Sequence, residues 1–167
     1  MSIVEESLNG IKKIFKGNAR LIQSREGYIS STECIFNEPA SLETIETICK
    51  KKGWKLPSEY IDFLLITNGA KLFRDEYGTC WEFFSIDQAA SIDYLPGLPA
   101  NLIPIAFYIG DFIFIDTDKV DQGKEYLIFH DHEEAFNNPS YVFKIPFDIW
   151  LDRLFISQGT KFWTWNN

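Results

Sequence analysis

The stretch Leu102-Ile103-Pro104-Ile105-Ala106-Phe107-Tyr108-Ile109-Gly110-Asp111-Phe112-Ile113-Phe114-Ile115-Asp116 carries the clearest fold signal in this 167-residue chain. Two apolar runs flank Gly110-Asp111, and glycine supplies the positive φ that a two-residue hairpin turn requires. The runs therefore predict two antiparallel strands, 102–109 and 112–116. Because the second run is almost entirely apolar, we expect that strand to be central and covered on both faces. Pro104 has no amide hydrogen to donate, which predicts that its strand starts late or lies near an edge.

Further strands are predicted around this hairpin, where short apolar and aromatic runs alternate with turn residues. They are expected over residues 71–74, 81–86, 125–130 and 141–145. Residues 18–40 show no sustained period, and their apolar pairs at 28–29 and 35–36 indicate either short strands or an ordered loop. Together these runs predict a curved, mostly antiparallel sheet of about five to six strands.

Helices are predicted on both sides of the strand-rich part. Ser2 and Glu5 form a capping box, Ser41 is an N-cap, and Pro57 fits a first helical turn, where a missing amide hydrogen costs nothing. Apolar residues at helical spacing then predict helices over residues 2–16, 42–52, 57–68, 87–95 and 146–158. Helices first, a meander of strands and a closing helix are typical of an α+β fold. Because no repeat or linker interrupts it, the chain 1–167 is expected to form one domain.

The net charge of −8 lies entirely in the second part of the chain. Residues 1–70 carry nine basic and nine acidic residues, whereas residues 71–167 carry seven basic and fifteen acidic residues. Proteins that bind nucleic acid neutralise its phosphates with Lys and Arg. This balance therefore disfavours direct nucleic-acid binding and permits a basic protein partner.

The cysteine pattern and the hydropathy indicate in which cellular compartment the protein is expected. Cys34, Cys49 and Cys80 are odd in number and lack CxxC spacing, so neither a disulfide framework nor a thiolate zinc site is indicated. No run approaches the roughly 18 uninterrupted apolar residues of a membrane-spanning helix, and residues 1–6 lack the pattern of a signal peptide. We therefore expect reduced thiols, a cytoplasmic location and no membrane partner.

Three patterns are candidates for chemistry, and each has a simpler interpretation. His130-Asp131-His132-Glu133 puts two histidines on one strand face, but it stands where the strand gives way to an acidic loop and lacks a rigid third ligand. The segment 116–123 has alternate carboxylates like a calcium loop, but its third acid is displaced and no Glu stands at the twelfth position. Cys80 is best interpreted as a small buried thiol. We therefore predict no catalytic residue, metal or cofactor, while carboxylate pairs of the glycosidase type stay open because their separations are spatial.

A cluster of acids is the strongest functional signal that remains. Residues 111–134 contain eight acids and two lysines, a net charge of −6. Such a run is usually a solvated face, but most of these acids fall at the ends and turns of neighbouring predicted strands, so the sheet is expected to gather them on one rim. A rim of this kind raises association rates with a basic partner about 10- to 1,000-fold at low salt. The predicted partner-binding residues are Asp111, Asp116, Asp118, Asp121, Asp131, Glu133 and Glu134.

Three stretches carry a resemblance to a known family. They are a helix with Leu-Pro, Tyr, Phe-Leu and Asn-Gly at 56–69, an Ile-Pro-Ile strand with a Gly-Asp hairpin at 103–116, and a strand with an acidic end at 125–133 followed by the final helix at 147–154. In these the chain resembles the SUKH superfamily, which includes yeast cell-wall-synthesis regulators of the Smi/Knr type and many bacterial immunity proteins. The resemblance covers about residues 41–156 and leaves out the first helix and the Trp-rich tail, 160–167. Its motif residues, expected to be mainly structural, are Leu56, Pro57, Tyr60, Phe63, Leu64, Asn68, Gly69 and Gly110.

The resemblance implies a non-enzymatic binding protein, which in bacteria commonly neutralises a toxin encoded beside it. Many such toxins act on nucleic acid and need basic residues to grip phosphates, so the acidic rim is expected to occupy the basic active-site face of a toxin domain. No small-molecule ligand is implied. The sequence departs from the family pattern at two positions: Ala70 replaces a second glycine, and the turn at Gly110-Asp111 is shorter than usual. Both differences affect any binding surface that the chain would share with the family. A regulatory scaffold of the cell-wall-regulator type is the alternative, followed by a cryptic hydrolase or metal enzyme.

Overall fold

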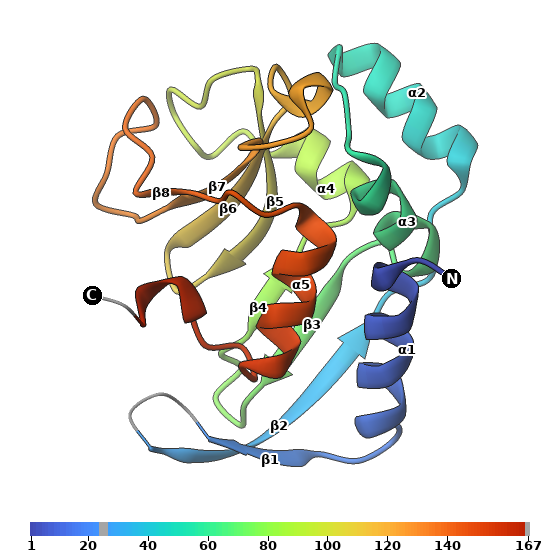
Figure 1. Ribbon diagram of the computed structural model, residues 1–167, viewed down its shortest axis with the longest axis vertical. Helices are drawn as coiled ribbons and strands as arrows, with labels where there is room; N and C mark the ends of the chain where they lie inside the picture. The colour runs from blue at the N-terminus through green and yellow to red at the C-terminus, as the bar shows by residue number, and fades with distance from the viewer. Residues whose placement is uncertain (24–26, 166–167) are drawn as a thin grey trace.

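The fold is built on an antiparallel sheet whose strands follow one another in chain order (Figure 1). The computed structural model describes residues 1–23 and 27–165, and within these the sheet has eight strands. They are β1 (Arg20–Gln23), β2 (Ile29–Phe36), β3 (Ala70–Arg74), β4 (Trp81–Phe83), β5 (Leu102–Tyr108), β6 (Asp111–Asp116), β7 (Leu127–His130) and β8 (Tyr141–Val142). The α+β class and the antiparallel pairing are confirmed, whereas the expected five to six strands were too few.

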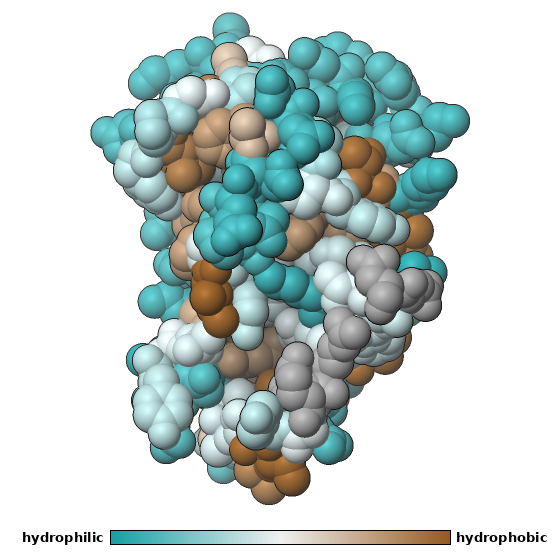
Figure 2. All heavy atoms as spheres, turned by 90° about the vertical axis from the view of Figure 1, so that its left-hand side faces the viewer, coloured by the Kyte–Doolittle hydropathy of each residue, from teal (hydrophilic) through white to brown (hydrophobic). Residues whose placement is uncertain are grey.

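The two extra strands, β1 and β2, form a hairpin within residues 18–40, with Leu21 opposite Ser31. Some of its apolar side chains lie outward, with Leu21 73% and Ile29 68% exposed, whereas Ile22 and Phe36 pack against the core and the polar Thr32 is buried. Figure 2 shows hydrophobic side chains gathered at the lower end of the molecule, the end where Figure 1 places this hairpin. Since apolar side chains lie both at the surface and against the core, and a polar one is buried, hydrophobic periodicity does not reveal these strands.

The hairpin of β5 and β6 forms as the sequence predicts. Tyr108 lies opposite Asp111 beside the turn, and all six residues of β6 are buried. One face of β6 looks toward the helices, and the other carries an aromatic cluster in which the ring centroids of Phe114 and Phe136 lie 5.9 Å apart. The expectation of a central strand covered on both faces is therefore confirmed.

The placement of Pro104 and the end of the strand expected over 81–86 differ from the prediction for local reasons. Pro104 does not mark an edge, because β5 lies between β4 and β6. The register of β5 against β6 shifts between Pro104 and Ala106, and a bulge of this kind accommodates a residue that cannot donate to the ladder. The strand expected over 81–86 ends at Phe83, because Ser85 already caps the following helix.

Five helices lie within the described residues: α1 (Ile3–Ile14), α2 (Leu42–Lys52), α3 (Ser58–Ile66), α4 (Ile86–Ser91) and α5 (Phe147–Ile156). Two 3-10 turns, η1 (Val120–Gln122) and η2 (Phe162–Thr164), complete the described elements. The side chains of Ser2 and Ser41 accept the amides of Glu5 and Thr44, which confirms both serines as N-caps. Helices α1, α3 and α5 contact one another and lie over one face of the sheet (Figure 1). No helix among the described residues is long and apolar enough to cross a membrane.

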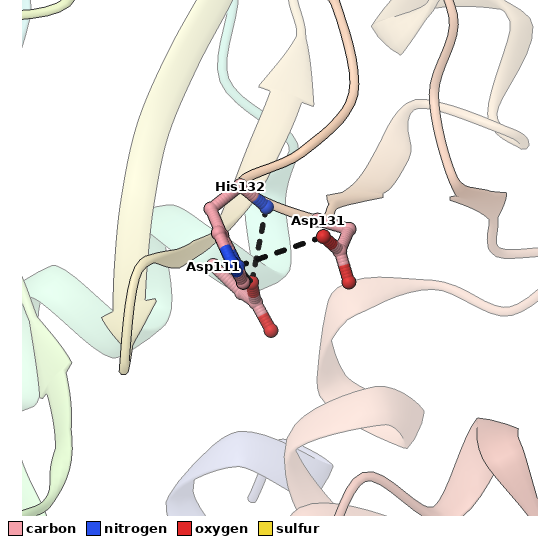
Figure 3. Close-up of side chains that lie close together, drawn as sticks. All are labelled: Asp111, Asp131 and His132. Atoms are coloured by element: carbon pink, nitrogen blue, oxygen red, sulfur yellow. Dashed lines mark hydrogen bonds and ion pairs between the residues drawn. The ribbon is translucent and has the colours of Figure 1, made fainter.

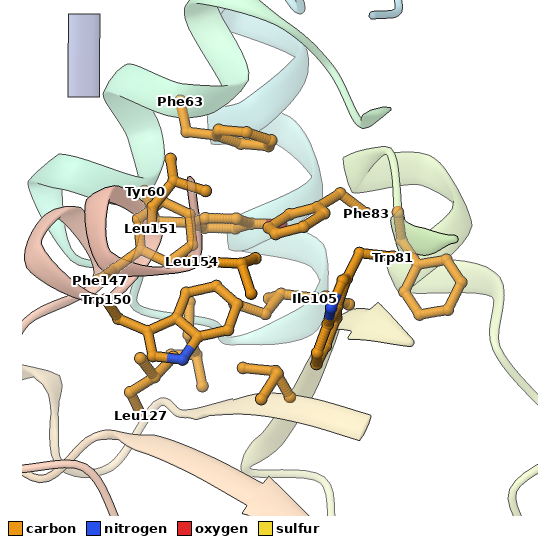
Figure 4. Close-up of a cluster of buried hydrophobic side chains, with 14 of the residues drawn as sticks. Tyr60, Phe63, Trp81, Phe83, Ile105, Leu127, Phe147, Trp150, Leu151 and Leu154 are labelled. Carbon is orange, nitrogen blue, oxygen red and sulfur yellow. The ribbon is translucent and has the colours of Figure 1, made fainter. Parts of the chain in front are cut away.

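Aromatic side chains fill the space between α3, α5 and the sheet (Figure 4). The ring centroids of Tyr60 and Phe63 lie 5.1 and 5.6 Å from that of Phe147, and Trp150 meets Trp81 of β4 at 6.2 Å. None of these five side chains is more than 1% exposed. Such pairs contribute about 0.5–1.5 kcal/mol each beyond the burial of their area. The family-motif aromatics of α3 are therefore core residues.

The motif residues Asn68 and Gly69 connect the end of α3 to the segment around β4 and α4. Helix α3 ends before Thr67, whose backbone is already extended. The Asn68 side chain accepts the amide of Ile86 at 2.9 Å, which links this turn to the start of α4. Gly69 has a φ of 92°, and a Cβ atom there would lie 2.7 Å from the carbonyl oxygen of Phe83. The position therefore requires glycine both for its φ and for its space.

The segment that follows α5, residues 157–165, is called the C-terminal strap below. Its Trp163 ring lies 5.2 Å from that of Phe129 and 5.1 Å from that of Phe143. Trp81 donates its indole hydrogen to the carbonyl oxygen of Gly159 at 2.7 Å. Trp165 is 53% exposed. One tryptophan of the tail therefore extends the core, and the other lies at the surface.

Candidate functional site

The seven acids predicted to bind a partner divide between the two ends of β6. One group holds Asp111, Asp131, Glu133 and Glu134, and the other holds Asp116, Asp118 and Asp121. The first group forms because His130 lies opposite Phe112, which puts the residues after β7 beside the start of β6. A six-residue strand spans about 17–20 Å. The expectation of a single acidic rim is therefore wrong.

Asp111 is buried, at 4% exposure, rather than presented to a partner. Its Oδ1 atom accepts hydrogen bonds from the backbone amide of His132 at 3.1 Å and from the His132 Nδ1 atom at 2.8 Å (Figure 3). Its Oδ2 atom accepts from the ammonium group of Lys161 in the C-terminal strap. Asp111, Asp131, His132 and Lys161 are called the Asp111 cluster below. Asp111 is thus engaged in internal contacts, and its contact with a partner stays a prediction.

The charges of the Asp111 cluster act on one another. Burial by itself raises the pKa of a carboxyl group, but hydrogen bonds from Lys161 and His132 outweigh it and hold the Asp111 pKa below its usual value. In turn, the hydrogen bond to Asp111 raises the pKa of His132, and the charges of Asp131 and Glu133 add to this effect. Asp111 is therefore ionised at neutral pH, and His132 takes up a proton more readily than a free histidine.

The acidic loop, residues 131–134, lies next to this buried carboxylate and is largely exposed. Its own hydrogen bonds shape it: the Asp131 carboxylate accepts the amide of Glu133 at 3.0 Å, and the Asp131 carbonyl accepts the amide of Glu134 at 3.1 Å. Asn138 donates to the Glu134 carboxylate at 2.9 Å, and Ser140 accepts the Asp131 amide. The loop is therefore held in one shape by its own bonds and by Asp111 beneath it.

The two histidines of the acidic strand end do not converge. Asp111, Asp131 and His132 offer oxygen and nitrogen atoms within 4.8 Å of one another, as a metal site would. Lys161 already neutralises the buried carboxylate of this trio, however. His130 is buried among aromatics, with its ring 5.3 Å from that of Phe136, because β7 ends at His130 and the chain turns before His132. The arrangement supports an internal ion pair rather than a histidine-rich ligand set.

The other group of acids lies against the α2–α3 connection. Asp116 is 7% exposed, and its Oδ1 atom accepts from the Asn101 side chain at 2.9 Å and from the Asp118 amide at 3.1 Å. Asp121 forms an ion pair with Lys55. Asp116 therefore stabilises the turn after β6, and its contact with a partner stays a prediction. The carboxylates in this segment do not converge as a calcium loop requires.

A pocket that no sequence pattern indicated lies beside the Asp111 cluster. Its volume is about 290 Å³, and it is enclosed by the β1–β2 hairpin, the end of β3 and the C-terminal strap. The lining residues come from segments far apart in the chain, so no motif could reveal them. Lys161 lines the pocket and also pairs with Asp111, which makes the two features neighbours. Its polar lining residues include Ser30, Thr32, Asp75, Gln158, Thr160 and Lys161.

Comparison with known proteins supports the resemblance seen in the motifs. The chain is 30% identical over 135 residues to the uncharacterized protein YnaB of Bacillus subtilis (strain 168), an alignment that covers 78% of this chain and 87% of that protein. It is 26% identical over 174 positions to the uncharacterized protein YobM of the same organism, with 98% and 92% of the two chains covered.

A family model described as SMI1 / KNR4 family (SUKH-1) matches residues 39–153. This range agrees with the 41–156 expected from the motifs, and it contains the acidic loop, the Asp111 side of the central hairpin and the core of α3. It leaves out α1, the β1–β2 hairpin and the C-terminal strap, so Lys161 and much of the pocket lie outside the matched region. The chain belongs to the SMI1/KNR4 family, SUKH-1.

Proposed function

We propose that this protein is a non-enzymatic immunity protein of the cytoplasm that binds and neutralises a basic toxin domain through its acidic loop. Family membership supports this role. The observation that carries it is the group of Asp131, Glu133 and Glu134, half-buried at Asp131 and exposed at the two glutamates, held over the buried Asp111 carboxylate. The proposed contact set is thus smaller than the seven acids expected from the sequence.

The acidic loop suits a basic partner for two physical reasons. Its negative charge steers an oppositely charged surface and raises the association rate about 10- to 1,000-fold at low salt. Its hydrogen bonds to Asn138 and Ser140 fix its shape before binding, which lowers the entropy lost on association. A toxin that acts on nucleic acid needs Lys and Arg on its active-site face, and the loop competes with phosphates for those side chains.

Charge removal in the loop tests the proposal. The triple variant Asp131→Asn, Glu133→Gln, Glu134→Gln is compared with Glu38→Gln, Glu46→Gln, Asp93→Asn, which removes the same charge from exposed acids elsewhere. The partner is the toxin domain encoded beside the gene, and the readouts are its Kd and protection of cells. We expect about a tenfold or greater loss of affinity only for the loop variant, with a weaker salt dependence.

The proposal would be overturned if both triple variants bound the toxin domain as the unchanged protein does. A regulatory scaffold is the second candidate, since the matched family model is named for SMI1 and KNR4, which the resemblance associates with cell-wall regulation. A constitutive cellular partner recovered by pull-down, with no toxin gene nearby, would favour the scaffold. Catalytic turnover of a substrate that is lost when a single carboxylate is substituted would instead indicate an enzyme.

A further inference from the structure

The pocket beside the Asp111 cluster has one carboxylate with unused bonding capacity. The Asp75 Oδ1 atom accepts the amides of Tyr77 and Thr79 at 2.9 and 2.8 Å, which closes the turn between β3 and β4. Within the described residues, its Oδ2 atom has neither a hydrogen bond nor an ion pair. The two amide bonds fix the orientation of the carboxylate, and Asp75 lines the pocket. The pocket therefore contains a preorientated acceptor with a negative charge.

Among the described residues that line the pocket, Lys161 is the one cation, and it does not offset this charge. Lys161 lines the same pocket, but its ammonium group pairs with Asp111 and lies 5.6 Å from the ring centroid of Tyr108 and 5.2 Å from that of Phe129. Its positive charge is thus already balanced. Counting Asp75, Lys161 and the Asp111 beneath it, the pocket has a net charge of −1, which favours a cation over an anion.

The remaining lining matches a planar donor group. Ser30 and Thr160 bring hydroxyl oxygens to the wall, and the Thr32 hydroxyl, which donates to the Arg20 carbonyl, keeps lone pairs that can accept. Ile22 and Phe73 supply an apolar part of the wall. A guanidinium group carries five donors in a fixed fork on an apolar stem, so it can satisfy a carboxylate and several hydroxyls at once.

We propose that this pocket receives an arginine side chain of the basic protein partner, with Asp75 as its ion-pair acceptor. The inference rests on the proposed function and adds an anchor beside the acidic loop, to which Lys161 and Asp111 connect the pocket. The volume of about 290 Å³ lies at the lower limit of small-molecule sites, about 300–1,000 Å³, and suits a single side chain. Buried arginine anchors are frequent hot spots of protein interfaces.

A small probe tests the pocket without the toxin. The full chain, labelled with ¹⁵N, is titrated with N-acetyl-L-arginine N-methylamide and with the citrulline analogue, which has nearly the same shape and no charge. We expect saturable amide shifts at Ser30, Asp75 and Thr160 with the arginine probe and about tenfold weaker binding of the citrulline probe. Asp75→Asn keeps the turn acceptor and is expected to remove this preference, whereas Asp93→Asn is expected to keep it.

Equal binding of the two probes, no shifts at the pocket, or an unchanged preference in Asp75→Asn would overturn the inference. A second arm measures the Kd for the toxin domain, and Asp75→Asn is expected to weaken this binding about tenfold. Normal toxin binding by that variant would likewise overturn the pocket as an anchor and leave the proposed function intact. Failure of the unchanged protein to bind any toxin domain would overturn the proposed function, and the probe titration reports on the pocket separately.

Discussion

Lys161 of the C-terminal strap pairs with Asp111 at the start of β6, across 50 residues of sequence. The Asp111 side chain is 5% exposed and that of Lys161 is 24% exposed, so both charges are substantially removed from water. Because His132 donates twice to the same carboxylate, one residue connects the strap, the central hairpin and the acidic loop.

Removing the charge of Asp111 is expected to destabilise the protein. Asp111→Asn leaves Lys161 without its counter-charge in a partly buried position, at a cost of about 1–3 kcal/mol in the free energy of unfolding. Chemical denaturation measures this. The double variant Asp111→Asn, Lys161→Met is expected to lose less than the sum of the two single variants, and additive losses would show that the pair is not coupled.

Protonation of His132 is expected to make part of the protein's stability depend on pH. Its pKa is raised above 6.5 in the folded state, so its contribution is fully present below pH 6.5 and is lost as the pH rises through the folded pKa. The stability difference between the unchanged protein and His132→Gln should therefore shrink toward alkaline pH. NMR titration of the imidazole checks the pKa directly, and a value at or below 6.5 would contradict the assignment.

Because the pKa of Asp111 is lowered, its ionised carboxyl group is expected to contribute to stability until the pH becomes strongly acidic. Its contribution is present above the unfolded value, near 3.8, and is lost as the pH falls through the folded pKa. Acid unfolding followed by circular dichroism should begin at a higher pH in Lys161→Met, because the missing ammonium group no longer favours the ionised carboxyl group. The same onset of acid unfolding in both proteins would count against this role of Lys161.

Gly69→Ala is expected to be more harmful than Gly53→Ala. Both glycines have positive φ, but only at Gly69 would a Cβ atom meet backbone, at 2.7 Å from the Phe83 carbonyl oxygen. The strain of a non-glycine residue at positive φ costs about 1–2 kcal/mol at each position. We expect a further loss at Gly69 that thermal unfolding detects, and equal losses would indicate that the surrounding backbone yields.

The two tryptophans of the tail are expected to differ in their effect on stability. Trp163→Ala removes contacts to Phe129 and Phe143 and should cost about 3 kcal/mol, near the lower limit for large buried aromatics because its position is only partly buried. Trp165→Ala should change stability by about 0.5 kcal/mol or less. Denaturant titration of both variants decides this, and similar losses would contradict the packing described for the strap.

Features set by neighbouring residues could be read from the chain. The turn at Gly110-Asp111, the caps at Ser2 and Ser41 and the apolar run of β6 each follow from local stereochemistry or from one repeating pattern. Tyr60 and Phe63, which were expected to be mainly structural, likewise lie in the core. These preferences act over a few residues, so no knowledge of the rest of the fold is needed.

Features that depend on distant segments could not be read in this way. The acids look like one cluster along the chain, but β6 holds Asp111 and Asp116 at opposite ends and buries both, because strand register and packing, not spacing, place them. The choice of Lys161 as the partner of Asp111 and the enclosure of the pocket around Asp75 depend on how the strap returns to the sheet. The sequence shows that a buried carboxylate such as Asp111 requires a counter-charge, but only the tertiary structure decides which residue provides it.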